Sequence, residues 1–194
     1  MKKQLSEMSL EELWELFPII LKEHNPQYKE WYETERQSIL DGINTGNIAR
    51  INHIGSSAVE GLIAKPTVDI LFEIDVRCNV TQLIDDLTAI GWLLMLQESD
   101  PLKLEFNKGY TPDGFAEKVY HLHVRYLGDW DELYFRDYLI AHPEIATEYG
   151  NLKLSLLEEY KHDRDGYTYA KSDFILKHSK TAKEEFSGKY RPGI

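Results

Sequence analysis

Apolar residues near the start of the chain recur at the three- and four-residue spacing of an amphipathic helix. They are Leu10, Leu13, Trp14, Phe17, Ile20 and Leu21. Ser9 and Glu12 have the spacing of a capping box, so the first helix is predicted to begin after Ser9. Pro18 lies inside the apolar run and is expected to kink or split this helix.

A second helical pattern follows at Asn25-Pro26, with the asparagine as the cap and the proline at the first position. Its end is expected before Gly46, because glycine is common just past the last turn of a helix. Its apolar face carries Tyr28, Trp31, Tyr32, Ile39 and Ile43. We interpret this aromatic stripe as a packing face that covers one side of a sheet.

The middle of the chain changes to the two-residue alternation of strands, and the last third returns to helical spacing. Strands are predicted over residues 48–54, 67–74, 92–96, 103–107 and 119–126, and helices over residues 80–90, 131–141, 143–160 and 165–186. Asn79 and Gly91 are expected to bound the helix that follows the second strand. A turn at Thr111–Gly114 is expected to join the last two strands as a hairpin.

The order of these elements predicts an α+β fold in one domain over residues 1–194. Helices are expected over residues 1–46, the sheet core over 47–126, and further helices over 127–194. With 42% apolar residues, a chain of 194 residues can bury a core of its own.

Composition indicates the cellular compartment and the class of binding partner. The single cysteine, Cys78, excludes an internal disulfide and favours a reducing compartment. The N-terminal residues lack the apolar core of a signal peptide, and no run of about 18 apolar residues occurs, so we expect a cytoplasmic protein without a membrane span. A net charge of −11 argues against general nucleic-acid binding and favours a small, metal-bound or cationic substrate.

Polar residues collect on one predicted face of the sheet, because side chains alternate along a strand. Val68, Ile70, Phe72 and Ile74 would face the core, whereas Asp69 and Glu73 would face the opposite way. The later strands would add Glu105, Asn107, His121, His123 and Arg125 to the same polar face. A solvated sheet face is the simpler explanation for any one of these residues. Two histidines beside several carboxylates are unusual for such a face, and Asp69 is unusual in mid-strand.

Carboxylates and imidazoles that converge can hold a divalent metal. Asp69, His121 and His123 are therefore candidate metal ligands if their strands are neighbours. The strand order and register are not fixed by the pattern.

A candidate phosphate turn precedes the second strand. Gly55 permits a tight turn, and Ser56 and Ser57 place hydroxyls beside backbone amides at a predicted helix start, which suits a phosphate group. Lys65 adds a positive charge just before the strand. Taken alone, the same residues are also an ordinary helix cap.

Several ordered motifs over residues 31–174 resemble the GrpB-like family of predicted nucleotidyltransferases. They are the runs His53–Val59, Gly61-Leu62, Ala64-Lys65-Pro66, Asp69-Ile70, His121–Val124, Phe135–Leu139 and His142-Pro143, together with Tyr149, Leu152-Lys153, Tyr167 and Lys171. The resemblance implies the nucleotidyltransferase fold, a mixed sheet flanked by helices with a Gly-Ser turn before an Asp-x-Asp strand. In active members of that superfamily the turn holds a triphosphate, and three carboxylates hold two magnesium ions.

The resemblance transfers only in part to this chain. Gly55 and Ser56 match the turn, and Asp69 matches the first carboxylate, but Leu71 stands at the second carboxylate position. Glu73 lies on the same face about 7 Å further along the strand and is the candidate substitute. The third position falls near His121 or His123.

Basic residues further along the chain complete the candidate site. Arg125 and Arg136 are expected to bind substrate phosphate, although Arg136 is equally suited to an ion pair with Asp137. Lys153 and Lys171 lie on predicted helices, where solvent exposure is the commoner fate of lysine.

These observations leave three hypotheses for function. The first is a nucleotidyltransferase that moves a nucleotidyl group from a nucleoside triphosphate to a small acceptor, with Mg²⁺ as the expected ion. The second is a non-catalytic protein that binds a nucleotide or a phosphorylated metabolite, which Leu71 favours. The third is a phosphohydrolase built on Asp69, His121 and His123, which would take Mn²⁺ or Zn²⁺. The acceptor, the nucleotide and the oligomeric state are left open.

Overall fold

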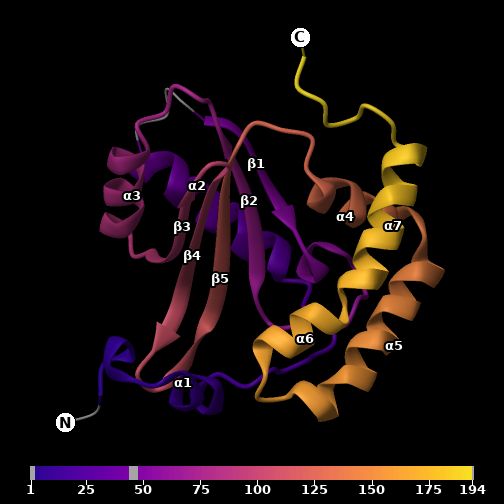
Figure 1. Cartoon of the computed structure of the whole chain (residues 1–194), viewed down its shortest axis with the longest axis horizontal. Helices are drawn as coiled ribbons and strands as arrows, with labels where there is room; N and C mark the ends of the chain where they lie inside the picture. Colours follow the sequence, from indigo (N-terminus) through magenta and orange to yellow (C-terminus); the bar gives the residue numbers. More distant parts are fainter. Residues whose placement is uncertain (1–2, 44–47, 194) are drawn as a thin grey trace.

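A five-stranded mixed sheet forms the centre of the molecule (Figure 1). The structure is a computed structural model that describes residues 3–43 and 48–193. The strands are β1 (Ile48–Ile54), β2 (Val68–Ile74), β3 (Leu93–Ser99), β4 (Leu102–Thr111) and β5 (Gly114–Tyr126). Their order is β1-β2-β5-β4-β3; the β2–β5 pair is parallel and the other pairs are antiparallel. The predicted mixed sheet with flanking helices is confirmed.

The first three helices follow the predicted caps closely, with one difference at the start of the second helix. They are α1 (Leu10–Leu16), α2 (Tyr28–Gly42) and, after β2, α3 (Val80–Ala89), preceded by a 3₁₀ turn at Leu5–Glu7. Ser9 and Glu12 form the capping box of α1, which ends before Pro18. The second helix begins at Tyr28, later than predicted, because the Asn25 side chain accepts the Gln27 amide in a separate turn. The predicted cap at Gly46 lies outside the described residues.

Four helices follow the sheet: α4 (Asp131–Ala141), α5 (Pro143–Tyr160), α6 (Arg164–Ala170) and α7 (Ser172–Glu185). The helix predicted over residues 165–186 is therefore two helices, interrupted at Lys171. In Figure 1 these C-terminal helices lie along one side of the sheet, and α3 lies on the other. Within the described residues, no helix is both long and apolar enough to cross a membrane.

The apolar face of the sheet forms the main core, as the alternation predicts. Val68, Ile70, Phe72 and Ile74 are buried there together with residues of α2 and α3. Leu71 points the other way but is also fully buried, because it packs with Ile54 and Leu133 where α4 crosses the sheet. Apolar packing of Leu71 with Ile54 and Leu133 therefore covers part of the polar face of the sheet. The polar residues of this face lie beside the packed region.

Candidate active site

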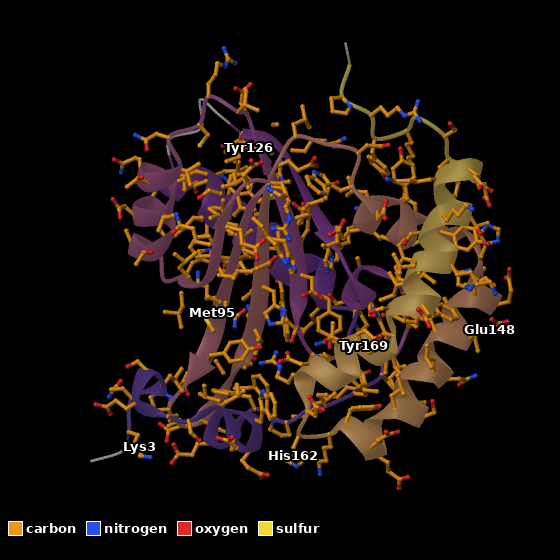
Figure 2. The ribbon with its side chains drawn as sticks, viewed as in Figure 1. Lys3, Met95, Tyr126, Glu148, His162 and Tyr169 are labelled. Carbon is orange, nitrogen blue, oxygen red and sulfur yellow. The ribbon has the colours of Figure 1, made fainter. Side chains whose placement is uncertain are left out.

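The strand register places a carboxylate and two imidazoles side by side. Asp69 on β2 is opposite His121 on β5, and Leu71 is opposite His123. On the other side of β5, His123 is opposite Glu105 of β4. Because side chains on paired strands project to the same face, these polar groups meet on one face of the sheet, where Asp69 and His123 line a cleft with residues of α4 and α7. Figure 2 shows side chains filling the space between the sheet and the C-terminal helices.

Asp69, His121 and His123 form a compact cluster. The Asp69 Oδ1 atom lies 2.9 Å from His121 Nδ1 and 3.8 Å from His123 Nε2. One ligand atom from each of the three residues lies within 4.8 Å of those of the other two. The structure therefore brings together the three residues that the sequence offered as metal ligands.

A chain of hydrogen bonds orients His121. Arg164 donates to the Tyr110 hydroxyl (3.0 Å), and that hydroxyl lies 2.8 Å from His121 Nε2. Because a carboxylate only accepts, the bond between Asp69 and Nδ1 places a proton on Nδ1, and in a neutral ring Nε2 then accepts from Tyr110. Both ring nitrogens of His121 are thus occupied in this arrangement.

A second chain orients His123. Its Nδ1 atom pairs with Glu105, and Glu105 in turn accepts from Arg125 Nη2 at 2.5 Å. Arg125 is buried and also donates to the carbonyls of Val124 and Leu104. We predicted Arg125 as a phosphate ligand, but the structure places its guanidinium behind Glu105, where it supports His123 instead.

The electrostatics of the cluster favour the charged carboxylate. Burial acts to raise the pKa of Asp69, but the hydrogen bond from His121 and the nearby His123 ring hold it well below its ordinary value. For His123, burial acts to lower the pKa, whereas the carboxylates of Asp69 and Glu105 raise it to about 9. The Asp69 carboxylate is therefore ionised and stabilised by two imidazoles. In such a cluster a bound metal ion would take the place of the imidazole protons.

The donor set fits one divalent ion. One carboxylate and two imidazoles suit Mn²⁺, Fe²⁺ or Zn²⁺ better than Mg²⁺, which prefers oxygen ligands. Glu105 on the second nitrogen of His123 is the outer partner that metal-bound histidines usually have. His121 would join the set only after it released Tyr110 or Asp69. Leu71 stands at the position of the second carboxylate of a two-metal site, and its apolar side chain is buried against Ile54 and Leu133 and offers no ligand atom.

Glu73, predicted as the substitute carboxylate, is engaged elsewhere. Its side chain is fully buried, and its two oxygens accept from Arg50 at 2.7 and 2.8 Å. The Gly128 amide also donates to it at 3.1 Å. Arg50 sits opposite Glu73 in the β1–β2 register, which the sequence pattern did not reveal. The structure therefore makes Glu73 part of a closed ion pair and does not bring it to Asp69.

The Gly55 turn lies directly against Asp69. Gly55 has a φ of 70°, and a Cβ placed on it would lie 2.6 Å from Asp69 Oδ2. Only glycine meets both conditions without strain. The following helix is a single 3₁₀ turn, Ser56–Ala58, so the predicted helix-end site for phosphate reduces to backbone amides and side chains. Ser56 faces the cleft, whereas Ser57 is buried and hydrogen-bonded to His53 at 3.0 Å.

Three lysines gather beside this turn: Lys153 is buried, and Lys65 and Lys171 are partly buried. Lys153 Nζ donates to Ser56 Oγ at 2.9 Å and to the Ile63 carbonyl, and its residue is only 3% exposed. Lys65 and Lys171 lie over the Tyr167 ring, with Nζ 5.2 and 4.3 Å from the ring centroid. The solvent exposure predicted for Lys153 is wrong, because this residue of α5 is buried against Ser56 and the Ile63 carbonyl. Lys171, between α6 and α7, is partly buried against the Tyr167 ring.

The lysines are cations without acidic partners. Among residues 3–43 and 48–193, none of the three takes part in an ion pair. Burial lowers the pKa of Lys65 and of Lys153 to about 7, and that of Lys171 to about 8, with the charge of Asp69 acting in the opposite direction. Sequence reasoning ranked only Lys65 as a site residue; the family motifs at Lys153 and Lys171 were the available signal for the other two.

Arg136 already has partners within the protein. Its guanidinium pairs with Asp137 at 2.7 Å and donates to the His53 carbonyl and the Tyr190 hydroxyl. It lines a separate cleft with Tyr32. The predicted ion-pair alternative describes Arg136 better than substrate binding does.

A cleft of about 660 Å³ opens from the cluster toward α4 and α7. Gly55, Ser56, Asp69 and His123 line its inner end. Trp130, Phe135 and Tyr149 form an apolar wall, and the outer end carries Asp129, Asp131 and Glu132. This volume is in the range that holds a small organic ligand.

Comparison with known proteins identifies the family of this chain. The model of the family described as "GrpB protein" matches residues 18–181. The chain belongs to the GrpB family. It is 33% identical over 161 residues to the glutamate-rich protein GrpB of Alkalihalophilus pseudofirmus, covering 81% of this chain and 91% of that relative.

Solved structures agree with this family assignment. The conserved protein GrpB from Enterococcus faecalis superposes with a TM-score of 0.75 and 29% identity, covering 86% of this chain and 99% of that one. A structure of Cid1 poly(U) polymerase with MgGTP bound matches at a TM-score of 0.48 and 15% identity, covering 75% of this chain and 44% of that one. At that score the second likeness carries no argument about the chemistry of this GrpB-family chain.

Proposed function

We propose that this GrpB-family protein is a metal-dependent nucleotidyltransferase that takes a nucleoside triphosphate and a small acceptor. The observation that carries the proposal is the group of three lysines beside Ser56 and Asp69, one buried and two partly buried, that have no acidic partner among the described residues. Buried cations are costly unless they are paired. A polyphosphate supplies the missing negative charge, and lysine is a common phosphate ligand.

Each residue then has a specific role. Lys65, Lys153 and Lys171 bind the phosphates and neutralise their charge. Ser56 and the backbone at Gly55 position the phosphate next to the cluster. A divalent ion held by Asp69 with His123, and with His121 when it releases a partner, would stabilise charge on the reacting phosphoryl group. Glu105 and Tyr110 keep the two imidazoles in place.

The donor set also supports a second candidate, a phosphohydrolase that uses water as the acceptor. One carboxylate with two imidazoles and a buried Leu71 differ from the three-carboxylate site of the nucleotidyltransferase superfamily. Both candidates require phosphate binding at the lysines. They differ in whether the nucleotidyl group ends on an organic acceptor or on water.

The first experiment is calorimetric titration with ATP, GTP, CTP and UTP, each in the presence of Mg²⁺, Mn²⁺ or Zn²⁺ and without metal. We expect metal-dependent binding that weakens about tenfold or more in Lys153→Met, the effect of losing one charge-assisted hydrogen bond. Asp69→Asn is expected to remove the metal dependence. Lys180→Met is the matched control, because Lys180 is an exposed lysine on α7.

Two further readouts separate the candidates. Release of pyrophosphate only when an organic acceptor is added supports the transferase, whereas release in buffer alone supports the hydrolase. Absence of binding for all four triphosphates under every metal condition would rule out both.

A further inference from the structure

The outer end of the cleft carries acidic residues, opposite in charge to the three lysines near Asp69. Asp129 precedes α4, and Asp131 and Glu132 lie in its first turn. We call these three residues the acidic wall. Lys65, Lys153 and Lys171 lie close enough to Asp69 to feel its charge but do not line this cleft, so basic and acidic groups both occur around the cluster.

The acidic wall is only partly neutralised. Lys183 pairs with Asp131 at 2.5 Å and donates to the Asp129 carbonyl at 2.9 Å. The Asp129 carboxylate accepts from the Tyr134 hydroxyl at 2.6 Å. Glu132 forms no hydrogen bond or ion pair with any part of the chain that the structure describes. A carboxylate that lines a cleft without a partner is available to a cationic group.

An independent observation at the same cleft points to a ligand. Ser179 on α7 lines the cleft, yet its residue is only 2% exposed. Within residues 3–43 and 48–193, its Oγ atom is buried without a hydrogen-bond partner. Buried hydroxyls are nearly always paired in folded proteins, so an unpaired one at a cleft is a position where a ligand completes the hydrogen bonding.

Apolar and aromatic side chains also line the cleft beside Glu132 and Ser179. The indole nitrogen of Trp130 donates to the Tyr126 carbonyl at 3.0 Å, so its polar atom is already satisfied. Phe135 and Tyr149 pack edge to face beside it, with ring centroids 5.3 Å apart. Such a wall accommodates the carbon skeleton of a ligand whose polar groups reach Glu132 and Ser179.

We propose that the acidic wall is the acceptor subsite, and that the acceptor is a small amine that carries several hydroxyl groups. Its ammonium group pairs with Glu132, one hydroxyl bonds to Ser179, and another is directed toward Asp69 and His123. The assignment as acceptor rests on the proposed nucleotidyl transfer. In that transfer the acceptor oxygen forms a bond to the α-phosphorus, the bond to pyrophosphate breaks, pyrophosphate leaves with the electron pair, and the hydroxyl proton passes to water.

The test uses glucosamine and glucose as probes, because they share a hydroxylated ring and differ in one amine. Binding of each to the full chain is measured by ligand-observed NMR in low-salt buffer at pH 6.5, without nucleotide. We expect glucosamine to bind at least about tenfold more tightly, the size of one charge-assisted contact. Glu132→Gln is expected to remove that preference, and Ser179→Ala to weaken binding of glucosamine.

Matched controls are Glu117→Gln and Ser155→Ala, which make the same chemical changes at exposed positions outside the cleft. They are expected to leave the preference intact. Equal binding of the two sugars, binding of neither, or a preference that survives Glu132→Gln would overturn the proposal.

Titration of the same variants with ATP separates this proposal from the proposed function. Triphosphate binding without any preference for glucosamine rejects the acceptor subsite alone. Preference for glucosamine without triphosphate binding supports a hydroxyamine site and rejects nucleotidyl transfer.

Discussion

Two groups of buried charge in this molecule are built in opposite ways. Glu73 is fully buried, and its carboxylate is matched by Arg50 and the Gly128 amide. Lys153 is almost equally buried, yet its ammonium group finds only the neutral oxygens of Ser56 and Ile63. The first charge has its counter-charge within the protein, and the second does not.

The two arrangements suit different roles, one within the fold and one toward a ligand. A buried ion pair that is closed within the fold fixes neighbouring elements; here Arg50 also holds the Tyr190 carbonyl of the C-terminal segment. A buried cation without an acid remains available for an anion from outside. Sequence alone ranked Glu73 above Lys153 as a site residue, and the pattern of partners reverses that order.

The largest expected effect tests the closed pair. Glu73→Gln leaves the largely buried Arg50 without its counter-charge, so the free energy of unfolding is expected to fall by about 3 kcal/mol. Urea unfolding measures this change. In the double variant Arg50→Met/Glu73→Leu much of the lost stability should return, because no charge is left unpaired. Full stability of Glu73→Gln would contradict a structural role for the pair.

A smaller effect on stability but a large effect on binding is expected for the open charge. Lys153→Met removes a desolvated ammonium group together with two hydrogen bonds, so the free energy of unfolding should change by less than about 1 kcal/mol. Affinity for inorganic triphosphate should fall about tenfold or more. Comparison of the two measurements with Lys180→Met is decisive: a loss of stability without loss of affinity would make Lys153 a structural residue.

The smallest change in any one step is expected for the pH dependence of the open charges, which accumulates gradually with each pH unit. In the folded protein the pKa is about 7 for Lys65 and Lys153, against 10.5 for an ordinary lysine. The unfolded chain therefore binds more protons between about pH 7 and 10.5, and without ligand the stability contributed by these lysines rises with pH in that window. The slope is at most about 1.4 kcal/mol per pH unit for each lysine.

Triphosphate binding should show the opposite trend. Bound phosphate favours the ammonium form, so affinity is expected to decrease as the pH rises above about 7. Unfolding and binding curves at pH 6.5, 8 and 9.5, taken for the native chain and for Lys153→Met, isolate the contribution of this lysine. Identical pH profiles for the two proteins would show that Lys153 does not titrate in this range.

The sequence predicted much of the fold because local rules decide it. The alternation along β2 assigned its core side correctly, and the Ser9–Glu12 pair located the start of α1. The last helix was predicted in one piece because helical spacing continues through Lys171, where α6 ends and α7 begins. Such an interruption depends on packing between helices and is not indicated by the local sequence.

The candidate site was predictable where it follows strand alternation and not where it depends on distant partners. Asp69, His121 and His123 share a face once β2 and β5 are neighbours, which the alternation anticipated. The partners of Glu73 and Lys153 come from β1 and from the turn at Ser56, the latter 97 residues from Lys153. A polar pattern shows that a charge is present but does not show what neutralises it.

The position of β5 in the sheet has a consequence for biosynthesis. β5 is the last strand of the sheet to be made, yet it lies between β2 and β4. The chain leaves the ribosome at roughly 5–20 residues per second, so one edge of β2 stays unpaired until β5 has been synthesised. Asp69 therefore gains its histidines in the same step that completes the sheet, and a nascent chain has no Asp69–His121–His123 cluster before β5 has paired with β2.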